Sequence, residues 1–249
     1  MQQRTAINPE IIQELLDSTR NAADRGQSQF FTPPALAALL GAAFPKYRET
    51  VVDLTCGNGQ LLAGVANQGT ACLLGADIDP CRSADGVHVQ RITRDLTHFY
   101  PLLVETRFTA DLFALNPPWG MEWHRDRLKE LADSPVTAVR HAFAASAGEP
   151  VIDSTIATLM IALDRCTSAG EGLLIANHAT LERLVFAEGA PCAALAEHIW
   201  LHLILDGNPM TGETTGRWVR DRPFYTSVLF CARTRARAAC RARERCDHT

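Results

Sequence analysis

The chain has 249 residues, of which 47% are hydrophobic and 21% charged, and its formal net charge is −4. This length suits one α/β domain with a substantial core, and the composition is ordinary for a soluble globular protein. No apolar stretch is long enough to span a bilayer, and the N-terminus has no apolar signal segment, which predicts a cytoplasmic protein without a membrane partner. The mild negative charge does not by itself indicate a nucleic-acid-binding protein.

The eight cysteines do not have the spacing of metal ligands or of a disulfide framework. Pairs such as Cys72 and Cys81, or Cys240 and Cys246, are too isolated for a zinc site. Mostly buried, reduced thiols are expected in a cytosolic protein, and no metal is predicted.

Hydrophobic patterning predicts strands that alternate with helices along most of the chain. Helices are expected at residues 9–24, 35–43, 60–67, 152–166 and 179–186, and strands at 51–54, 71–76, 87–93, 112–115, 172–176, 198–205 and 225–232. Thr32 is a candidate N-cap of the second helix. This alternation predicts an α/β fold with a doubly wound, mostly parallel sheet. A polar loop joins the last two strands, which predicts an antiparallel hairpin at one edge.

Two regions flank this core. Residues 1–232 are expected to form a single domain, of which residues 1–34 are a helical arm, and residues 233–249 to form a basic, flexible tail. The arginines of that tail could contact phosphates or simply be solvated. The polar stretches 120–150 and 206–223 follow strand ends, where loops usually contact substrates.

The tetrapeptide Asn116-Pro117-Pro118-Trp119 follows an apolar strand and is the most informative motif. The Asn116 side-chain carbonyl and the Pro117 backbone carbonyl can both accept hydrogen bonds from one planar NH2 group. The two prolines stiffen the turn, and Trp119 offers a flat face on which a planar substrate can stack. The alternative is a strand that simply ends at a Pro-Pro turn. The motif therefore favours a cradle for an amino group.

A glycine-containing turn follows the first predicted strand, at Asp53-Leu54-Thr55-Cys56-Gly57-Asn58-Gly59. Such a turn lets the backbone approach a ligand closely. The dinucleotide fingerprint G-x-G-x-x-G is absent, because its third position is Leu62. Asp77 and Asp95 end the next two predicted strands, where Asp77 could accept both hydroxyls of a ribose. Each acid alone suggests a solvated loop, but three acids at successive strand ends favour one shared crevice.

Together these motifs resemble S-adenosylmethionine-dependent amino-methyltransferases. With Gln29-Phe30-Phe31-Thr32-Pro33 before the first strand, the chain resembles the N6-adenine DNA methyltransferases in which the cofactor motifs precede the NPPW motif. The resemblance covers residues 26–120 by motif, and 150–232 by strand order only. It implies a Rossmann-like class I methyltransferase fold, S-adenosyl-L-methionine as cofactor, and DNA as the nucleic-acid partner.

The resemblance also assigns roles to individual residues. It implies that the cofactor is bound by Phe31, Thr32, Pro33, Asp53, Cys56, Gly57, Gly59, Asp77, Asp95 and Asn116. It implies that Asn116, Pro117, Pro118 and Trp119 carry the catalytic cradle. Trp119, with Phe224 or Tyr225 opposite, would hold a base flipped out of the duplex. No general base is required, because the amine loses its proton only after methyl transfer.

Three alternatives remain open at the level of sequence. RNA adenine and protein-glutamine methyltransferases resemble residues 51–120 equally well, and a non-catalytic module could keep the same fold. Related sequence-specific enzymes normally carry an additional recognition domain after the catalytic one. Here the globular pattern ends near residue 232. Recognition would therefore fall to a separate subunit or to the chain's own loops.

Overall fold

The computed structural model describes residues 32–44, 47–66, 70, 72–78, 89–206 and 225–234. The predicted helix at 9–24, the tail beyond residue 234, and the site candidates Phe31 and Phe224 lie outside these residues. No helix in the described ranges is long and apolar enough to cross a membrane.

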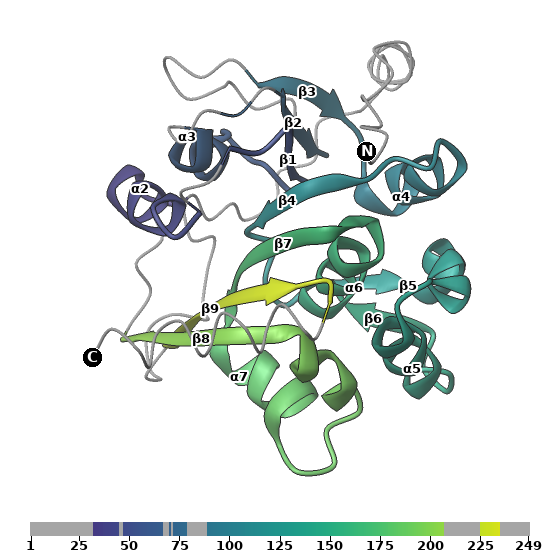
Figure 1. Cartoon of the computed structure of the whole chain (residues 1–249). Coiled ribbons are helices and arrows are strands. Elements are labelled where there is room, and N and C mark those ends of the chain that lie inside the picture. The colour runs from purple at the N-terminus through teal and green to yellow at the C-terminus, as the bar shows by residue number, and fades with distance from the viewer. Residues whose placement is uncertain are drawn as a thin grey trace.

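A seven-stranded sheet with the order β3-β2-β1-β4-β7-β9-β8 forms the centre of the molecule (Figure 1). Its strands are β1 (Thr50–Asp53), β2 (Cys72–Asp77), β3 (Gln90–Thr93), β4 (Ala110–Leu115), β7 (Cys166–Asn177), β8 (Ile199–Asp206) and β9 (Tyr225–Ala232). The pairs from β3 to β7 are parallel, whereas β9 runs antiparallel to both β7 and β8. The predicted mostly parallel sheet with an antiparallel edge hairpin is confirmed.

Both faces of the central strands are buried under helices, and successive strand residues, which point to opposite faces, pack in different clusters. Val51 and Leu112 pack in one hydrophobic cluster with α2 (Pro34–Gly41) and α3 (Gln60–Ala66). Their neighbours Val52 and Phe113 pack in the other cluster. That second layer contains α4 (Leu96–Glu105), α5 (Thr137–Ala145), α6 (Ser154–Arg165) and α7 (His178–Leu181). Burial on both faces explains why these strands are continuous apolar runs.

The chain order changes direction at the centre of the sheet. From β1 it proceeds to β2 and β3 on one side, whereas β4 pairs with β1 on the other side and leads to β7. In open α/β sheets, such a switch point leaves a crevice at the carboxyl ends of the strands, where ligands bind. The ends of β1 and β4 therefore meet where a ligand site is expected.

Residues 120–150 are more ordered than the predicted loop. They contain β5 (Glu122–His124), the 3-10 segment η1 (Arg125–Asp133) and α5. β5 pairs antiparallel with β6 (Val151–Asp153) in a separate two-stranded sheet. This pairing could not be predicted from the sequence, because each strand has only three residues and the two strands lie far apart in the chain.

Other differences concern helix ends. The predicted Thr32 N-cap is wrong: the N-cap of α2 is Pro33, whose carbonyl accepts the first helical hydrogen bond from the Ala37 N–H. There is no side-chain cap, because the proline ring has no acceptor atom. The helix α4 was not expected, and it contains Pro101. The predicted helix at 179–186 is α7 followed by the π-helical segment η2 (Glu182–Phe186), before the 3-10 segment η3 (Ala193–His198).

Candidate functional site

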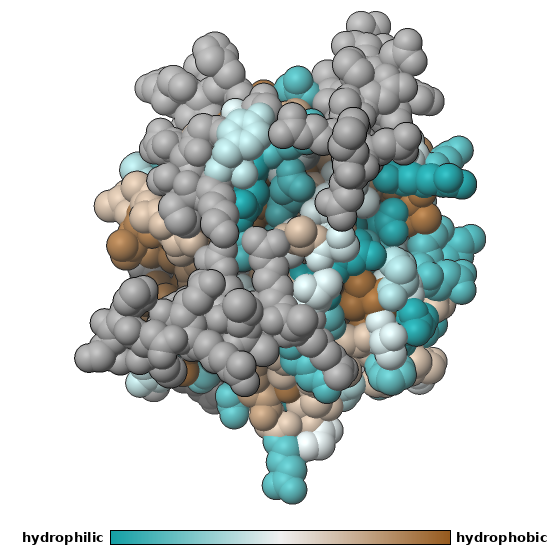
Figure 2. All heavy atoms as spheres, in the orientation of Figure 1, coloured by the Kyte–Doolittle hydropathy of each residue, from teal (hydrophilic) through white to brown (hydrophobic). Residues whose placement is uncertain are grey.

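A pocket lies at the carboxyl ends of the central strands, where the chain order changes direction. On the face shown in Figure 2, hydrophilic residues gather in a hollow. In the same view in Figure 1, this hollow lies over the central strands, between α3 and α4. The pocket is lined by Thr32, Asp53, Leu54, Thr55, Cys56, Gly57, Asn58, Leu61, Asp77, Ile78, Asp95, Leu96, Asn116, Pro117, Pro118, Met121 and Trp123. Nine of the residues predicted from sequence are in this set: Thr32, Asp53, Cys56, Gly57, Asp77, Asp95, Asn116, Pro117 and Pro118.

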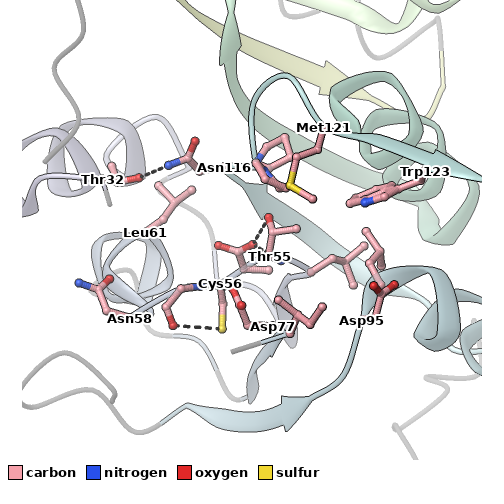
Figure 3. Close-up of a pocket in the computed structure, with 17 residues that line it drawn as sticks. Thr32, Thr55, Cys56, Asn58, Leu61, Asp77, Asp95, Asn116, Met121 and Trp123 are labelled. Carbon is pink, nitrogen blue, oxygen red and sulfur yellow. Dashed lines mark hydrogen bonds between the residues drawn. The ribbon is translucent and has the colours of Figure 1, made fainter. Parts of the chain in front are cut away.

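The turn between β1 and α3 forms the floor of this pocket (Figure 3). Gly57 and Gly59 have φ values of 49° and 79°, in the left-handed region that favours glycine. The turn also crosses the neighbouring strand closely: a Cβ on Gly75 of β2 would lie 2.7 Å from the Cys56 Sγ atom. The glycines of the motif therefore allow both a sharp turn and close packing of that turn on β2.

Asp77 fastens the same turn from the end of β2. Its Oδ2 atom accepts a 2.7 Å hydrogen bond from the Gly57 backbone N–H. The Cys56 N–H donates to the Ala76 carbonyl at 2.9 Å. The Gly57 carbonyl accepts from the Arg91 guanidinium at 2.6 Å. The predicted ribose-binding acid thus orders the turn and lines the pocket at the same time.

Asp53, at the end of β1, is 1% exposed although it lines the pocket. Its Oδ1 atom accepts from the Thr55 N–H at 2.9 Å and from the Thr55 hydroxyl at 3.4 Å. Burial raises the pKa of Asp53 to about 8, and the charge of Asp77 adds to the effect. A cation in the pocket would favour the ionised form of this carboxyl, so the site is suited to a positively charged ligand.

Asp95 lies between β3 and α4 and has two roles. Its Oδ1 atom caps α4, because it accepts from the Thr97 N–H at 2.7 Å and from the Thr97 hydroxyl at 2.6 Å. The residue also lines the pocket beside Leu96, opposite Trp123 in Figure 3. The sequence located this carboxylate correctly in the crevice but did not reveal its capping role.

Asn116 and the two prolines after β4 close the opposite side of the pocket. The Asn116 Nδ2 atom donates to the hydroxyl of buried Thr32 at 3.4 Å, across 84 positions of sequence. This bond orients the amide so that its oxygen points away from Thr32 (Figure 3). The Phe-Thr-Pro segment and the NPPW motif therefore meet through one side-chain contact.

Trp119 is not among the residues that line the pocket. It packs, partly buried, against the hydrophobic cluster on the α2 and α3 face of the sheet. The aromatic ring in the pocket wall is that of Trp123, on β5, which is 9% exposed, and Met121 lies beside it. The sequence does carry one signal for Trp123: its apolar ring stands between the polar residues Glu122 and His124. This alternation is typical of a short strand with one buried face.

The remaining predicted residues lie elsewhere. Pro33 and Gly59 adjoin the pocket in sequence but do not line it. Tyr225, at the start of β9, is 42% exposed, and its ring stands nearly perpendicular to the His178 ring, with 6.3 Å between the ring centroids. Within the described ranges, no cluster of three or more His, Cys, Asp or Glu side chains could hold a metal ion. The binding roles of these residues, and the stacking role of Trp119, stay predictions.

No protein-family model matches the sequence, and no curated protein matches it. Solved structures with a similar fold do. One is a protein described as a modification subunit of a type I restriction enzyme from Vibrio vulnificus, with a TM-score of 0.54 and 16% identity over 90% of this chain and 48% of that one. A second is described as a class I S-adenosylmethionine-dependent methyltransferase from Listeria monocytogenes, with a TM-score of 0.50 and 13% identity over 90% of this chain and 68% of that one.

A third similar structure is the type IIG restriction endonuclease BpuSI, with a TM-score of 0.53 and 13% identity over 84% of this chain and 26% of that one. The chain spans about half the length of the Vibrio vulnificus protein and a quarter of BpuSI. At these identities the likeness establishes the fold alone. The predicted Rossmann-like class I methyltransferase fold is confirmed.

Proposed function

We propose that this chain is an S-adenosylmethionine-dependent N-methyltransferase that methylates the N6 amino group of adenine in DNA. The observation that carries the proposal is the meeting of two motif groups in one pocket. Asp53, Asp77 and Asp95 line one side, and Asn116 with Pro117 and Pro118 lines the other. The pocket lies at the switch point of the sheet, where ligands bind in this architecture.

The donor set suits the proposed cofactor. S-adenosylmethionine supplies an electrophilic methyl group on a sulfonium centre when it is bound. The acidic side of the pocket suits this cation. Its positive charge would favour the ionised form of the buried Asp53 carboxyl. Asp77 would hold the ribose hydroxyls, and Asp95 the adenine amino group. Ile78, Leu96 and Trp123 provide apolar walls for a flat ring.

The other side of the pocket would orient the acceptor. An adenine amino nitrogen is a weak nucleophile, because its lone pair is delocalised into the ring. The Asn116 Oδ1 atom and the Pro117 carbonyl would accept its two hydrogens, which directs the lone pair at the methyl carbon. With the cofactor bound, a nitrogen–carbon bond would form as the carbon–sulfur bond breaks, and the extra proton would leave to solvent. Alignment of this kind can contribute roughly 7–11 kcal/mol.

DNA as the acceptor is supported by the contact between Thr32 and Asn116, since it joins the Phe-Thr-Pro segment to the NPPW motif. This is the pair of motifs through which the chain resembles N6-adenine DNA methyltransferases. Two proteins of similar fold are a modification subunit of a restriction enzyme and a restriction endonuclease. On this analogy, we propose that a partner subunit reads the DNA sequence.

The test is to incubate the purified chain with S-adenosylmethionine that carries a labelled methyl group. Acceptors should be duplex DNA, RNA and a protein extract, followed by mass spectrometry of nucleosides and of peptides. N6-methyladenine in DNA is the expected product. Methyladenine in RNA alone, or methylglutamine in protein alone, would replace the acceptor and keep the reaction class. Cofactor binding without methyl transfer to any fraction would contradict a transferase that acts alone, and would leave either a non-catalytic module or a subunit that transfers methyl only with its partner.

A further inference from the structure

Ser154 contacts the loop that carries the amine cradle at two points. It is the first residue of α6 and is fully buried. Its hydroxyl donates to the Pro118 carbonyl at 2.5 Å, and its backbone N–H donates to the Met121 carbonyl at 2.9 Å. These two carbonyls stand on either side of the turn at Trp119 and Gly120. One residue therefore holds both ends of that turn.

The loop depends on donors from outside itself. Pro117 and Pro118 have no N–H group, so this stretch cannot attach itself by donating backbone hydrogen bonds. Its carbonyls can only accept, and a donor must be brought to them by another element. Ser154 supplies that donor to Pro118, at a separation of 36 positions in sequence.

The Ser154 hydroxyl is not required for the helix that it begins. Serine at a helix start commonly accepts a hydrogen bond from a backbone N–H one turn later. In α6 this capping is done by Asp153, whose Oδ1 atom accepts from the Thr155 N–H at 2.8 Å. The Ser154 hydroxyl is thereby available to donate to the loop.

The helix offers a firm reference for the loop. Every residue from Ser154 to Asp164 is buried, and the Thr158 hydroxyl donates back to the Ser154 carbonyl at 2.7 Å. The strand before the helix continues the same attachment, since Ile152 of β6 pairs with Trp123 of β5. The cradle residue Pro118 and the wall residues Met121 and Trp123 are thus all held in place by contacts with the start of α6 or with the strand before it.

We propose that Ser154 is the positioning residue for the acceptor side of the pocket. It places the Pro117-Pro118 segment, and with it Asn116, at the distance and angle that methyl transfer requires. This rests on the function proposed above, but it concerns a residue that lies outside the pocket wall and acts through the Pro118 carbonyl. Small displacements at such a position are costly, because a shift of about 1 Å can reduce a rate by roughly 100-fold.

The test compares Ser154→Ala with Thr158→Val. Each change removes one buried hydroxyl from α6, but only the first hydroxyl contacts the loop. Ser154→Ala should lower kcat by about 10- to 100-fold, while the cofactor Kd from titration calorimetry changes by less than about 2-fold. Thr158→Val should leave kcat within about 2-fold of the wild type, with a comparable loss of thermal stability.

A second measurement does not require activity. Hydrogen exchange of the cofactor-free protein should be faster at residues 119–123 in Ser154→Ala and unchanged there in Thr158→Val. Ser154→Cys fills the site with a slightly larger thiol that donates only weakly, so it should show the same direction of change if the alanine variant folds poorly. Equal kcat and equal loop exchange in the two helix variants would overturn the proposal. A wild-type protein that neither binds cofactor nor transfers methyl would instead refute the function, and the exchange comparison would still test the positioning role.

Discussion

The two sides of the pocket are built in different ways. The acidic side consists of Asp53, Asp77 and Asp95. Asp53 and Asp95 accept from backbone N–H groups two residues ahead, and Asp77 accepts from the Gly57 N–H, 20 positions earlier. The amine side, at Asn116 and the two prolines, is held by Thr32 and Ser154, which lie 84 and 36 positions away. Backbone N–H groups thus hold the carboxylates of the first side, two of them locally, whereas side-chain hydroxyls from distant segments hold the second.

This difference predicts separable defects. Changes on the acidic side should alter cofactor affinity, and often stability, because the carboxylates also hold the turns together. Changes on the amine side should alter transfer while cofactor affinity remains. The four predictions below test this separation.

Asn116→Ala should cause the largest effect, because it removes the only side chain proposed to accept a hydrogen bond from the amine. A loss of transfer of about 100- to 1,000-fold is expected, as for removal of one transition-state hydrogen-bonding group elsewhere. Cofactor binding, measured by titration calorimetry, should survive the change.

The matched control is Asn177→Ala, at the end of β7. Asn177 caps α7 by accepting from the Ala179 N–H at 2.9 Å, and it does not line the pocket. This variant should lose about 1 kcal/mol of stability and keep its transfer rate. If Asn116→Ala loses cofactor binding, or keeps full turnover, the two sides are not separable as described.

Gly75→Ala should disturb the acidic side from below. The added Cβ would lie 2.7 Å from Cys56 Sγ and 3.0 Å from Val89 Cγ1, so the turn that forms the pocket floor must shift. Overpacking of this kind costs about 1–3 kcal/mol. Cofactor affinity should fall by about 10-fold or more, measured by calorimetry beside urea unfolding.

Gly148→Ala is the control, because a Cβ there meets nothing within 4 Å. It should leave both cofactor affinity and stability near the wild-type values. Adding Cys56→Ala to Gly75→Ala should recover part of the loss, since it removes the nearest obstructing atom. No recovery in the double variant would argue against the clash as the cause.

Asp53 should make stability depend on pH. In the unfolded chain this carboxyl ionises near its ordinary pKa of 3.8, whereas in the folded protein its pKa is raised to about 8. Its contribution to the free energy of unfolding is therefore complete below pH 4 and is lost as the pH rises toward 8. The wild type should lose up to about 1.4 kcal/mol per pH unit relative to Asp53→Asn over this range.

Urea unfolding at several pH values between 4 and 8 measures this difference. The exposed Asp133 offers a control, and Asp133→Asn should follow the wild-type curve. Parallel curves for the wild type and Asp53→Asn would show that the buried carboxyl does not hold its proton.

The smallest effect should be spectroscopic. Trp123 lines the pocket, whereas Trp119 packs outside it against the α2 and α3 face. Cofactor binding should therefore change the fluorescence of Trp123. Trp123→Phe should remove most of this change, and Trp119→Phe should preserve it. The reverse result would return the stacking surface to the tetrapeptide.

The alternation of strands with helices and the positions of the glycines were sufficient to predict the sheet and most of the acidic side of the pocket. Asp53, Asp77 and Asp95 could be located because parallel strands end at one edge of a sheet, so acids at successive strand ends converge. The antiparallel pairing of β8 with β9 was predicted from the polar sequence between them. Such features can be predicted because they depend on short, continuous segments of the sequence.

The amine side shows where that reasoning stops. The motif Asn116-Pro117-Pro118 was identified from its own residues, but nothing local indicated that Trp119 would pack away from the pocket and Trp123 would line it. β5 has three residues, too few to be recognised until it pairs with β6. The sequence by itself determined the sheet, the acids at the strand ends and the amide with its two prolines. Only the tertiary structure decided which aromatic ring reaches the pocket and which hydroxyls hold the loop, because those contacts join segments far apart in the chain.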